Sequence, residues 1–187
     1  EHVVQIKNDI KRVADAHRNY REKIGGLKEK DIRVAMDEWN YWYGDYIYGE
    51  LGVRYHQKDG LGIAMGLHEY FRNSDIFYMA NYAQTVNVIG AIKTTQTASA
   101  FETTGLVLKL YRNQFGSVPV KIGAPANPNL DISAALTEDK TALTVAVVNM
   151  DANPQHVLID LGEIKAGKQG QAWVIQNTDP EAYNTPG

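Results

Sequence analysis

Two adjacent carboxylates, Asp37 and Glu38, stand directly after a short apolar run. The run Ile32–Met36 has the length and composition of a buried strand, and such a strand accommodates two adjacent acids only at its end. Strand side chains alternate in direction, so at most one of the carboxylates faces a site there, and Asp37 is expected to pair behind the strand. A carboxylate in that place can act as a nucleophile or as a general acid or base. A strand followed by a solvated acidic turn explains the pair equally well.

Aromatic residues follow the two acids at once. Trp39, Tyr41, Trp42 and Tyr43 all occur within five residues. This is more apolar surface than a free loop carries, and flat rings can cover the apolar face of a sugar while an acid does the chemistry. The aromatic cluster therefore favours a carbohydrate site over a solvated turn.

A second strand is expected to bring further polar groups to the same place. Residues 60–72 carry a helical apolar stripe that includes His68, which is expected to pack through hydrogen bonds rather than to catalyse. Ile76–Ala80 follows as another strand, which makes a βαβ unit with parallel strands. Asn81 and Gln84 then fall just past the second strand, on the rim that carries Glu38. The alternative, that Asn81 caps a turn and Gln84 bonds to backbone, stays open.

Two segments resemble one known family. Asp37-Glu38-Trp39-Asn40-x-Trp42-Tyr43 resembles the nucleophile segment of the α-L-arabinofuranosidases of glycoside hydrolase family 51. Met79–Ile89 is similar to the Ala-Asn-x-Ala-Gln-x-Val-Asn-Val segment of that family. The segments lie in the expected order, about forty residues apart, and the resemblance covers roughly Ile32 to Ile122.

The resemblance implies a role for each site residue. Glu38 would be the nucleophile of a retaining glycosidase, acting on arabinose-containing oligosaccharides or polysaccharides such as arabinoxylan and arabinan. Gln84 would bond a sugar hydroxyl, Trp42 would form an aromatic wall, and Asn81 would be a neighbouring substrate contact. Trp39 and Asn40 would support Glu38 from behind. No cofactor or metal is implied, and family members often form trimers or hexamers.

The resemblance also shows what this sequence does not contain. A retaining mechanism needs a second carboxyl about 5–5.5 Å from the nucleophile as acid and then base. In the family this acid follows an Asn in an Asn-Glu pair, and the sequence has no such dipeptide. Glu50 is expected to be a surface or ion-pair residue. The acid is therefore expected outside this chain, in the remainder of the same enzyme.

The overall pattern predicts an α/β region followed by a β region. Helical periodicity covers 3–29 and 100–115, the stretch 94–99 is expected to be a loop, and 117–122 is extended. A (β/α)8 TIM barrel needs about 200 residues or more. Residues 1–122 are therefore expected to be the C-terminal part of a barrel. Residues 123–187 are expected to be part of a jelly-roll-like β-sandwich, with strands at 130–136, 143–149, 156–161 and 171–175.

Composition excludes several classes of protein. The 19 basic and 22 acidic residues give a net charge of -3, without a basic field for nucleic acid. No apolar run approaches the roughly eighteen residues that a membrane span needs. The absence of cysteine excludes disulfides and thiol chemistry and fits a cytoplasmic protein, with a secreted one as the alternative.

Two other functions compete with the arabinofuranosidase. One is a related barrel glycosidase, such as an endoglucanase, with the same glutamate at a strand end but another sugar. The other is a non-catalytic carbohydrate-binding β-sandwich with a helical appendage. The second predicts that Glu38 can be replaced without loss of function.

Overall fold

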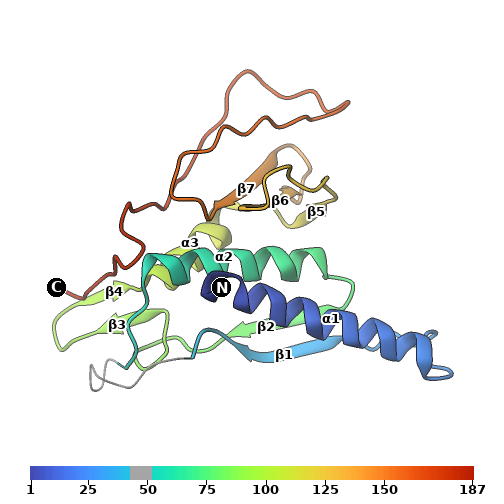
Figure 1. Cartoon of the computed structure of the whole chain (residues 1–187), viewed down its shortest axis with the longest axis horizontal. Coiled ribbons are helices and arrows are strands. Elements are labelled where there is room, and N and C mark those ends of the chain that lie inside the picture. The colour runs from blue at the N-terminus through green and yellow to red at the C-terminus, as the bar shows by residue number, and fades with distance from the viewer. Residues whose placement is uncertain (43–51) are drawn as a thin grey trace.

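The computed structural model describes residues 1–42 and 52–187. Figure 1 shows helices α1 and α2 lying between a two-stranded sheet, β1–β2, and a three-stranded sheet, β5–β6–β7. Helix α3 packs beside α2, and the small hairpin β3–β4 lies at one end of the molecule. The chain is therefore an α/β structure followed by β structure, as the sequence predicts.

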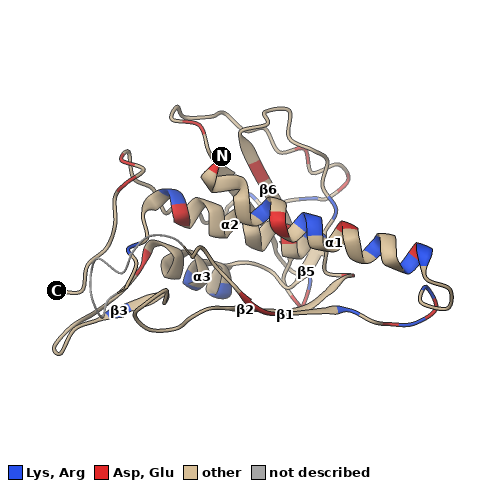
Figure 2. Ribbon diagram, turned by 60° about the horizontal axis from the view of Figure 1, so that its bottom comes forward, with Lys and Arg blue, Asp and Glu red and all other residues tan. Residues whose placement is uncertain are grey.

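The first helix presents an apolar stripe to the core. A short 3-10 turn, η1 (His2–Val4), leads into α1 (Gln5–Lys23). Ile6, Ile10 and Ala14 are buried, at the spacing of three to four residues that the sequence predicts. The helix ends earlier than position 29, because Ile24 is extended and Gly26 has a φ of +75°. Its outer face alternates positive and negative charges (Figure 2), and exposed ion pairs such as Lys11 with Asp15 lie along it.

The predicted βαβ unit is confirmed. Strand β1 (Val34–Trp39), helix α2 (Gln57–Arg72) and strand β2 (Phe77–Tyr82) follow one another, and the two strands are parallel. Both strands lie further along the chain than expected, because pairing of Trp39 with Tyr82 extends the ladder. Asp37, Glu38 and Asn81 are therefore inside the strands, not beyond them.

Strand β1 is not buried, contrary to the prediction from its apolar run. Val34 and Met36 are half-buried and pack against the core, while Ala35 and Asp37 are exposed. Within the described residues β1 has one partner strand, and helices cover one of its faces. None of the described elements covers the other face of the β1–β2 pair.

Helix α2 has glycines at the two positions where Trp39 and Tyr41 pack against it. A Cβ at Gly66 would lie 3.0 Å from the Trp39 ring, and a Cβ at Gly62 would lie 1.8 Å from the Tyr41 hydroxyl. The first contact would be tighter than most real Cβ contacts, and the second would be closer than a real Cβ tolerates. The two glycines therefore let Trp39, at the end of β1, and Tyr41, just after it, pack directly onto the helix.

The stretch expected to be a loop forms a hairpin instead. Strands β3 (Ile92–Thr94) and β4 (Ser99–Phe101) pair antiparallel around 95–98. Helix α3 (Thr103–Gln114) consequently starts three residues later than position 100, with Glu102 as its N-cap residue. A three-residue strand is too short to leave a periodic signal in the sequence.

The C-terminal sheet is confirmed in part. Strands β5 (Val118–Val120), β6 (Leu130–Leu136) and β7 (Leu143–Asn149) form an antiparallel sheet. The strands predicted at 156–161 and 171–175 are wrong, since neither segment forms a ladder with any described residue. Leu158 is 96% exposed. Apolar alternation produces a strand only where a neighbouring strand accepts its hydrogen bonds.

A buried polar network joins the two layers. His68 of α2 lies 2.7 Å from Asp131 of β6 through Nδ1 and 2.6 Å from the Tyr111 hydroxyl of α3 through Nε2. The pKa of His68 is lowered by burial, so the ring is neutral, donating to Asp131 and accepting from Tyr111. The prediction that His68 packs through hydrogen bonds is confirmed. No helix among the described residues has the length and apolar character to cross a bilayer.

Candidate functional site

The C-terminal ends of β1 and β2 lie side by side and bring two polar side chains to one rim. Trp39 pairs with Tyr82 across the parallel ladder. Glu38 and Asn81 each precede this pair by one residue, and both are exposed. Their positions in a parallel register make them neighbours on the two strands. The rim predicted from the sequence is therefore present, with Asn81 in β2 rather than after it.

A register shift directs Glu38 away from the helices. Met36 and Trp39 both face the helix layer, Trp39 being buried with its ring centroid 5.1 Å from that of Tyr70. Strict alternation would place position 38, not 39, on that side, and the ladder is irregular between Met36 and Trp39. Asp37 and Glu38 are therefore both exposed, as at a β-bulge that redirects a side chain. Exposure alone does not distinguish the two carboxylates, so the expectation that at most one of them faces the site stays a prediction.

Neither carboxylate has a protein partner in the described part of the chain. No hydrogen bond or ion pair reaches Asp37 or Glu38 from residues 1–42 or 52–187. The pairing of Asp37 behind the strand stays a prediction, because none of the described residues supplies its partner. An exposed carboxylate with both oxygens open is available for a substrate.

Asn40 ties the end of β1 to the segment after β2. Its side-chain amide nitrogen lies 2.8 Å from the Ala83 carbonyl, 2.8 Å from the Ile89 carbonyl and 2.8 Å from the Tyr55 hydroxyl. Its carbonyl oxygen accepts from the Tyr41 amide at 2.7 Å. The Ala83 amide donates to the Trp39 carbonyl at 3.2 Å. The backbone on both sides of the rim is thereby held at a fixed separation.

Two further predicted site residues, Gln84 and Trp42, are exposed. Gln84 is exposed, follows a cis peptide bond after Ala83, and its amide donates to the Val86 carbonyl at 3.3 Å. Trp42 is 70% exposed. Tyr43 and Glu50 lie outside the described residues. The described residues hold no group of three or more His, Asp or Glu side chains that could bind a metal ion.

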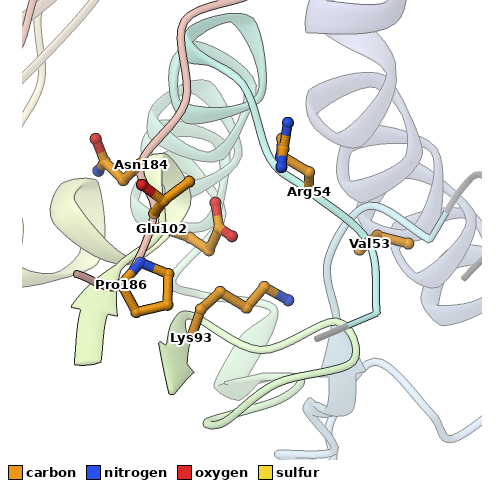
Figure 3. A pocket seen from close by; sticks show the side chains of 7 residues that line it. Val53, Arg54, Lys93, Glu102, Asn184 and Pro186 are labelled. Carbon is orange, nitrogen blue, oxygen red and sulfur yellow. The ribbon is translucent and has the colours of Figure 1, made fainter. Parts of the chain in front are cut away.

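Sequence reasoning missed a buried charged cluster next to the rim. Figure 3 shows Arg54, Lys93 and Glu102 around a cavity of about 30 Å³, with Asn184 and Pro186 of the C-terminal segment beside Glu102. Lys93 and Glu102 are 3% and 2% exposed, respectively. Each follows two apolar residues and precedes two threonines, and this charge beside uncharged neighbours is the signal that a sequence reader could have used. A cavity of this size holds about one water molecule, not a sugar.

This cluster supports the backbone near the rim. The Lys93 ammonium donates to the Val88 carbonyl at 2.9 Å, and the Glu102 carboxylate accepts from the Tyr55 amide at 3.3 Å. Burial lowers the pKa of Lys93 and raises the pKa of Glu102 to about 7, although the nearby ammonium opposes the second effect. Glu102 therefore changes its protonation near neutral pH.

Replacing Glu102 by Gln should make the stability of the protein less dependent on pH. The folded pKa of about 7 lies above the ordinary value of 4.5, so protonated Glu102 stabilises the fold below pH 4.5 and this contribution is lost as the pH rises through 7. We expect Glu102→Gln to gain stability relative to wild type between about pH 5 and about pH 8 in urea unfolding. The exposed Glu138→Gln variant is the control. A difference from wild type that is equal at both pH values would contradict this.

Comparison with known proteins gives one consistent result. The family model for the α-L-arabinofuranosidase C-terminal domain matches residues 37–187. A probable α-L-arabinofuranosidase C of Aspergillus clavatus is 35% identical over 146 residues, covering 67% of this chain and 29% of that protein. An intracellular exo-α-L-arabinofuranosidase of Bacteroides ovatus is 28% identical over 155 residues, covering 75% and 30%.

Solved structures agree with the sequence relatives. The α-L-arabinofuranosidase of Thermotoga maritima in its arabinose complex has a TM-score of 0.69 at 26% identity, covering 79% of this chain and 34% of that one. The family 51 enzyme of Thermotoga petrophila has a TM-score of 0.67 at 26% identity, covering 76% and 34%. The chain thus spans about a third of the length of the proteins that it matches.

Proposed function

The chain belongs to the α-L-arabinofuranosidase C-terminal domain family, and we propose that it carries the nucleophile half of the active site of a retaining α-L-arabinofuranosidase. The enzyme would release terminal α-L-arabinofuranosyl units from arabinoxylan, arabinan or their oligosaccharides. The relatives are named as α-L-arabinofuranosidases, which supports this activity. The observation that carries the proposal is the exposed Glu38 at the rim of two parallel strands, beside Asn81 and without a partner among the described residues.

We propose that the two parts of the chain belong to two successive domains of the same enzyme. Residues 1–122 would be the C-terminal part of a (β/α)8 barrel, and residues 123–187 part of a jelly-roll-like β-sandwich. The parallel β1–β2 pair with α2 between its strands is the repeating unit of such a barrel. Strand β5, just before the proposed boundary, joins the second sheet. In barrels of this kind the reacting groups lie at the C-terminal ends of the strands, where Glu38 lies.

Glu38 would act as a covalent nucleophile. One carboxylate oxygen forms a bond to the anomeric carbon while the bond to the leaving oxygen breaks, giving a glycosyl ester. The leaving oxygen takes its proton from a carboxylic acid supplied by the remainder of the same enzyme. A water molecule, deprotonated by the resulting carboxylate, then attacks the anomeric carbon and releases Glu38. Two inversions at one carbon give net retention.

The neighbouring side chains would bind and orient the sugar. Gln84 would hydrogen-bond a sugar hydroxyl near Glu38, Asn81 would contact the same ring, and the exposed ring of Trp42 would form one wall. Trp39 and Asn40 would hold the strand end from behind. The reaction needs no cofactor.

Hydrolysis of aryl glycosides by the full-length enzyme tests this function. We expect release of 4-nitrophenol from 4-nitrophenyl α-L-arabinofuranoside, with the α-anomer of arabinose as the first product in a time-resolved NMR spectrum. Preferential cleavage of cello-oligosaccharides would instead support an endoglucanase-like enzyme. Sugar binding without any hydrolysis would support a binding module. A β-anomer as first product would overturn the retaining mechanism.

We also propose an oligomeric state and a cellular location for the enzyme. The family resemblance suggests three or six copies, and the absence of cysteine fits a cytoplasmic enzyme, with a secreted one as the alternative. Light scattering of the purified enzyme measures the number of copies, and a monomer would contradict this part of the proposal.

A further inference from the structure

We propose that Tyr55 is a positioning residue that fixes Glu38 relative to Gln84. This inference rests on the proposed function, because it assigns Tyr55 a part in the reaction of Glu38. Tyr55 follows Asn40 by fifteen positions and belongs to neither of the segments that resemble the family. Its side chain is 0% exposed, so it cannot contact the sugar itself.

The Tyr55 hydroxyl lies where the two sides of the rim meet. It donates to the Tyr41 carbonyl at 2.8 Å and accepts from the Asn40 amide at 2.8 Å. The Ile89 carbonyl is 3.3 Å away. The hydroxyl therefore bonds the chain directly after Glu38 and approaches the segment that contains Gln84.

Tyr55 is itself held from the opposite side. Its backbone amide donates to the Glu102 carboxylate at 3.3 Å, and the Lys93 ammonium lies 5.7 Å from its ring centroid. Lys93 in turn bonds the Val88 carbonyl. Because Tyr55 is packed on every side, its hydroxyl is a fixed point and not a mobile contact.

The hydroxyl also determines how Asn40 uses its two amide hydrogens. Three acceptors, on Tyr55, Ala83 and Ile89, lie 2.8 Å from one amide nitrogen. The Tyr55 hydroxyl fixes the orientation of the Asn40 amide by accepting one hydrogen while giving its own to Tyr41. Without it, the amide can turn and the Tyr41 carbonyl loses a buried donor.

The expected effect is on the covalent step and not on substrate binding. A displacement of about 1 Å at a reacting group lowers a rate about a hundredfold. Tyr55→Phe keeps the ring and removes the hydroxyl, so a smaller displacement and about a tenfold loss are expected. The dissociation constant of the substrate, obtained from the concentration dependence of the burst rate, should stay within about twofold, because no sugar contact is removed.

Tyr111→Phe is the matched control. It also removes a tyrosine hydroxyl with a short hydrogen bond, to His68, but on the far side of α2. A purely structural effect would lower the thermal stability of both variants and leave the rate per folded molecule unchanged. A positioning effect appears in Tyr55→Phe alone.

Formation of the glycosyl-enzyme should be measured by stopped flow on the full-length enzyme with 2,4-dinitrophenyl α-L-arabinofuranoside. This leaving group needs no acid, so the burst rate reports on attack by Glu38. We expect about a tenfold slower burst for Tyr55→Phe and less than twofold change for Tyr111→Phe. Equal burst rates for wild type and Tyr55→Phe would overturn the inference but not the proposed function. A wild-type enzyme that forms no glycosyl-enzyme would overturn the proposed function as well.

A second variant covers the case in which Tyr55→Phe does not fold. Asn40→Asp retains the size of the side chain and the acceptor for the Tyr41 amide but loses the amide donors to Tyr55, Ala83 and Ile89. It should slow the burst at least as much as Tyr55→Phe. A normal burst in Asn40→Asp would overturn the inference independently.

Discussion

Glu38→Gln should reduce hydrolysis of α-L-arabinofuranosides by the full-length enzyme by at least about a thousandfold, since loss of a covalent nucleophile removes the only route through an ester intermediate. The change keeps the shape of the side chain and removes its charge. The Glu38 side chain is exposed and its carboxylate contacts no hydrogen-bond or ion-pair partner among the described residues, so the change should not destabilise the fold. Surface changes away from packed groups usually alter stability by less than about 0.5 kcal/mol. The unfolding midpoint should therefore match that of wild type.

Chemical rescue separates a missing nucleophile from a damaged site. In Glu38→Ala the space of the carboxylate is open, and azide can attack the anomeric carbon directly while 2,4-dinitrophenolate leaves. A single displacement inverts the carbon, so the product should be the β-L-arabinofuranosyl azide. Azide restoring the rate with this product supports the role of Glu38, and restored hydrolysis with retention would argue against it.

Asp37→Asn is the matched control for Glu38. Both carboxylates are exposed on the same strand, because the register shift brings them to the open side together. Burial alone therefore does not tell the two apart. The proposal assigns the bond-forming role to Glu38, so Asp37→Asn should retain at least about a tenth of the activity. Loss of all activity in Asp37→Asn, with Glu38→Gln still active, would reverse the assignment.

The parts of the fold that the sequence predicts are those set by local periodicity. The stripe of Ile6, Ile10 and Ala14 repeats every three to four residues over several turns, and the βαβ unit alternates strong apolar runs with a helical stripe. Parallel strands joined by one helix then bring their C-terminal ends together, whatever the details. For this reason Glu38 and Asn81 could be placed on one rim in advance.

Other features depend on contacts that no local pattern records. The register shift between Met36 and Trp39 brings Trp39 against Gly66 of α2, and it reverses the expected direction of a side chain. The hairpin β3–β4 consists of strands too short to show a period. Segments 156–161 and 171–175 alternate as strands do, yet they have no ladder partner among the described residues. Local periodicity records none of these features.

Asp131 illustrates the same limit, because its sequence context predicts only one residue of an alternating strand. Its carboxylate side chain is 1% exposed and accepts from Lys7 of α1 at 2.6 Å and from His68 of α2 at 2.7 Å. Arg72 of α2 also donates to it. These contacts lower the pKa of Asp131 far below its ordinary value, despite the opposing effect of burial. One charge therefore holds the sheet β5–β6–β7 to both helices of the other layer.

Asp131→Asn should destabilise the protein by about 3 kcal/mol, the lower end of the cost of breaking a buried charge network. The lower end of this cost applies because the side chains of Lys7 and Arg72 are 30% and 34% exposed. Both cations can therefore be solvated by water after the carboxylate is removed. The unfolding midpoint should fall by about 6–12 °C in a thermal melt. Asp75→Asn, which breaks the exposed pair with Arg18, is the control and should cost less than about 1 kcal/mol.

The pH dependence of this difference tests its electrostatic origin. Because the folded pKa of Asp131 lies below its ordinary value of 3.8, the contribution of its charge is complete above pH 3.8 and is lost as the pH falls toward the folded pKa. The stability gap between wild type and Asp131→Asn should therefore be constant from about pH 5 to 7 and narrow in stronger acid. A gap that stays unchanged in strong acid would mean that shape, and not the carboxylate charge, joins the two layers. In that case β6 would be held to α2 by packing alone, and His68 could be replaced by an apolar residue of similar size at little cost.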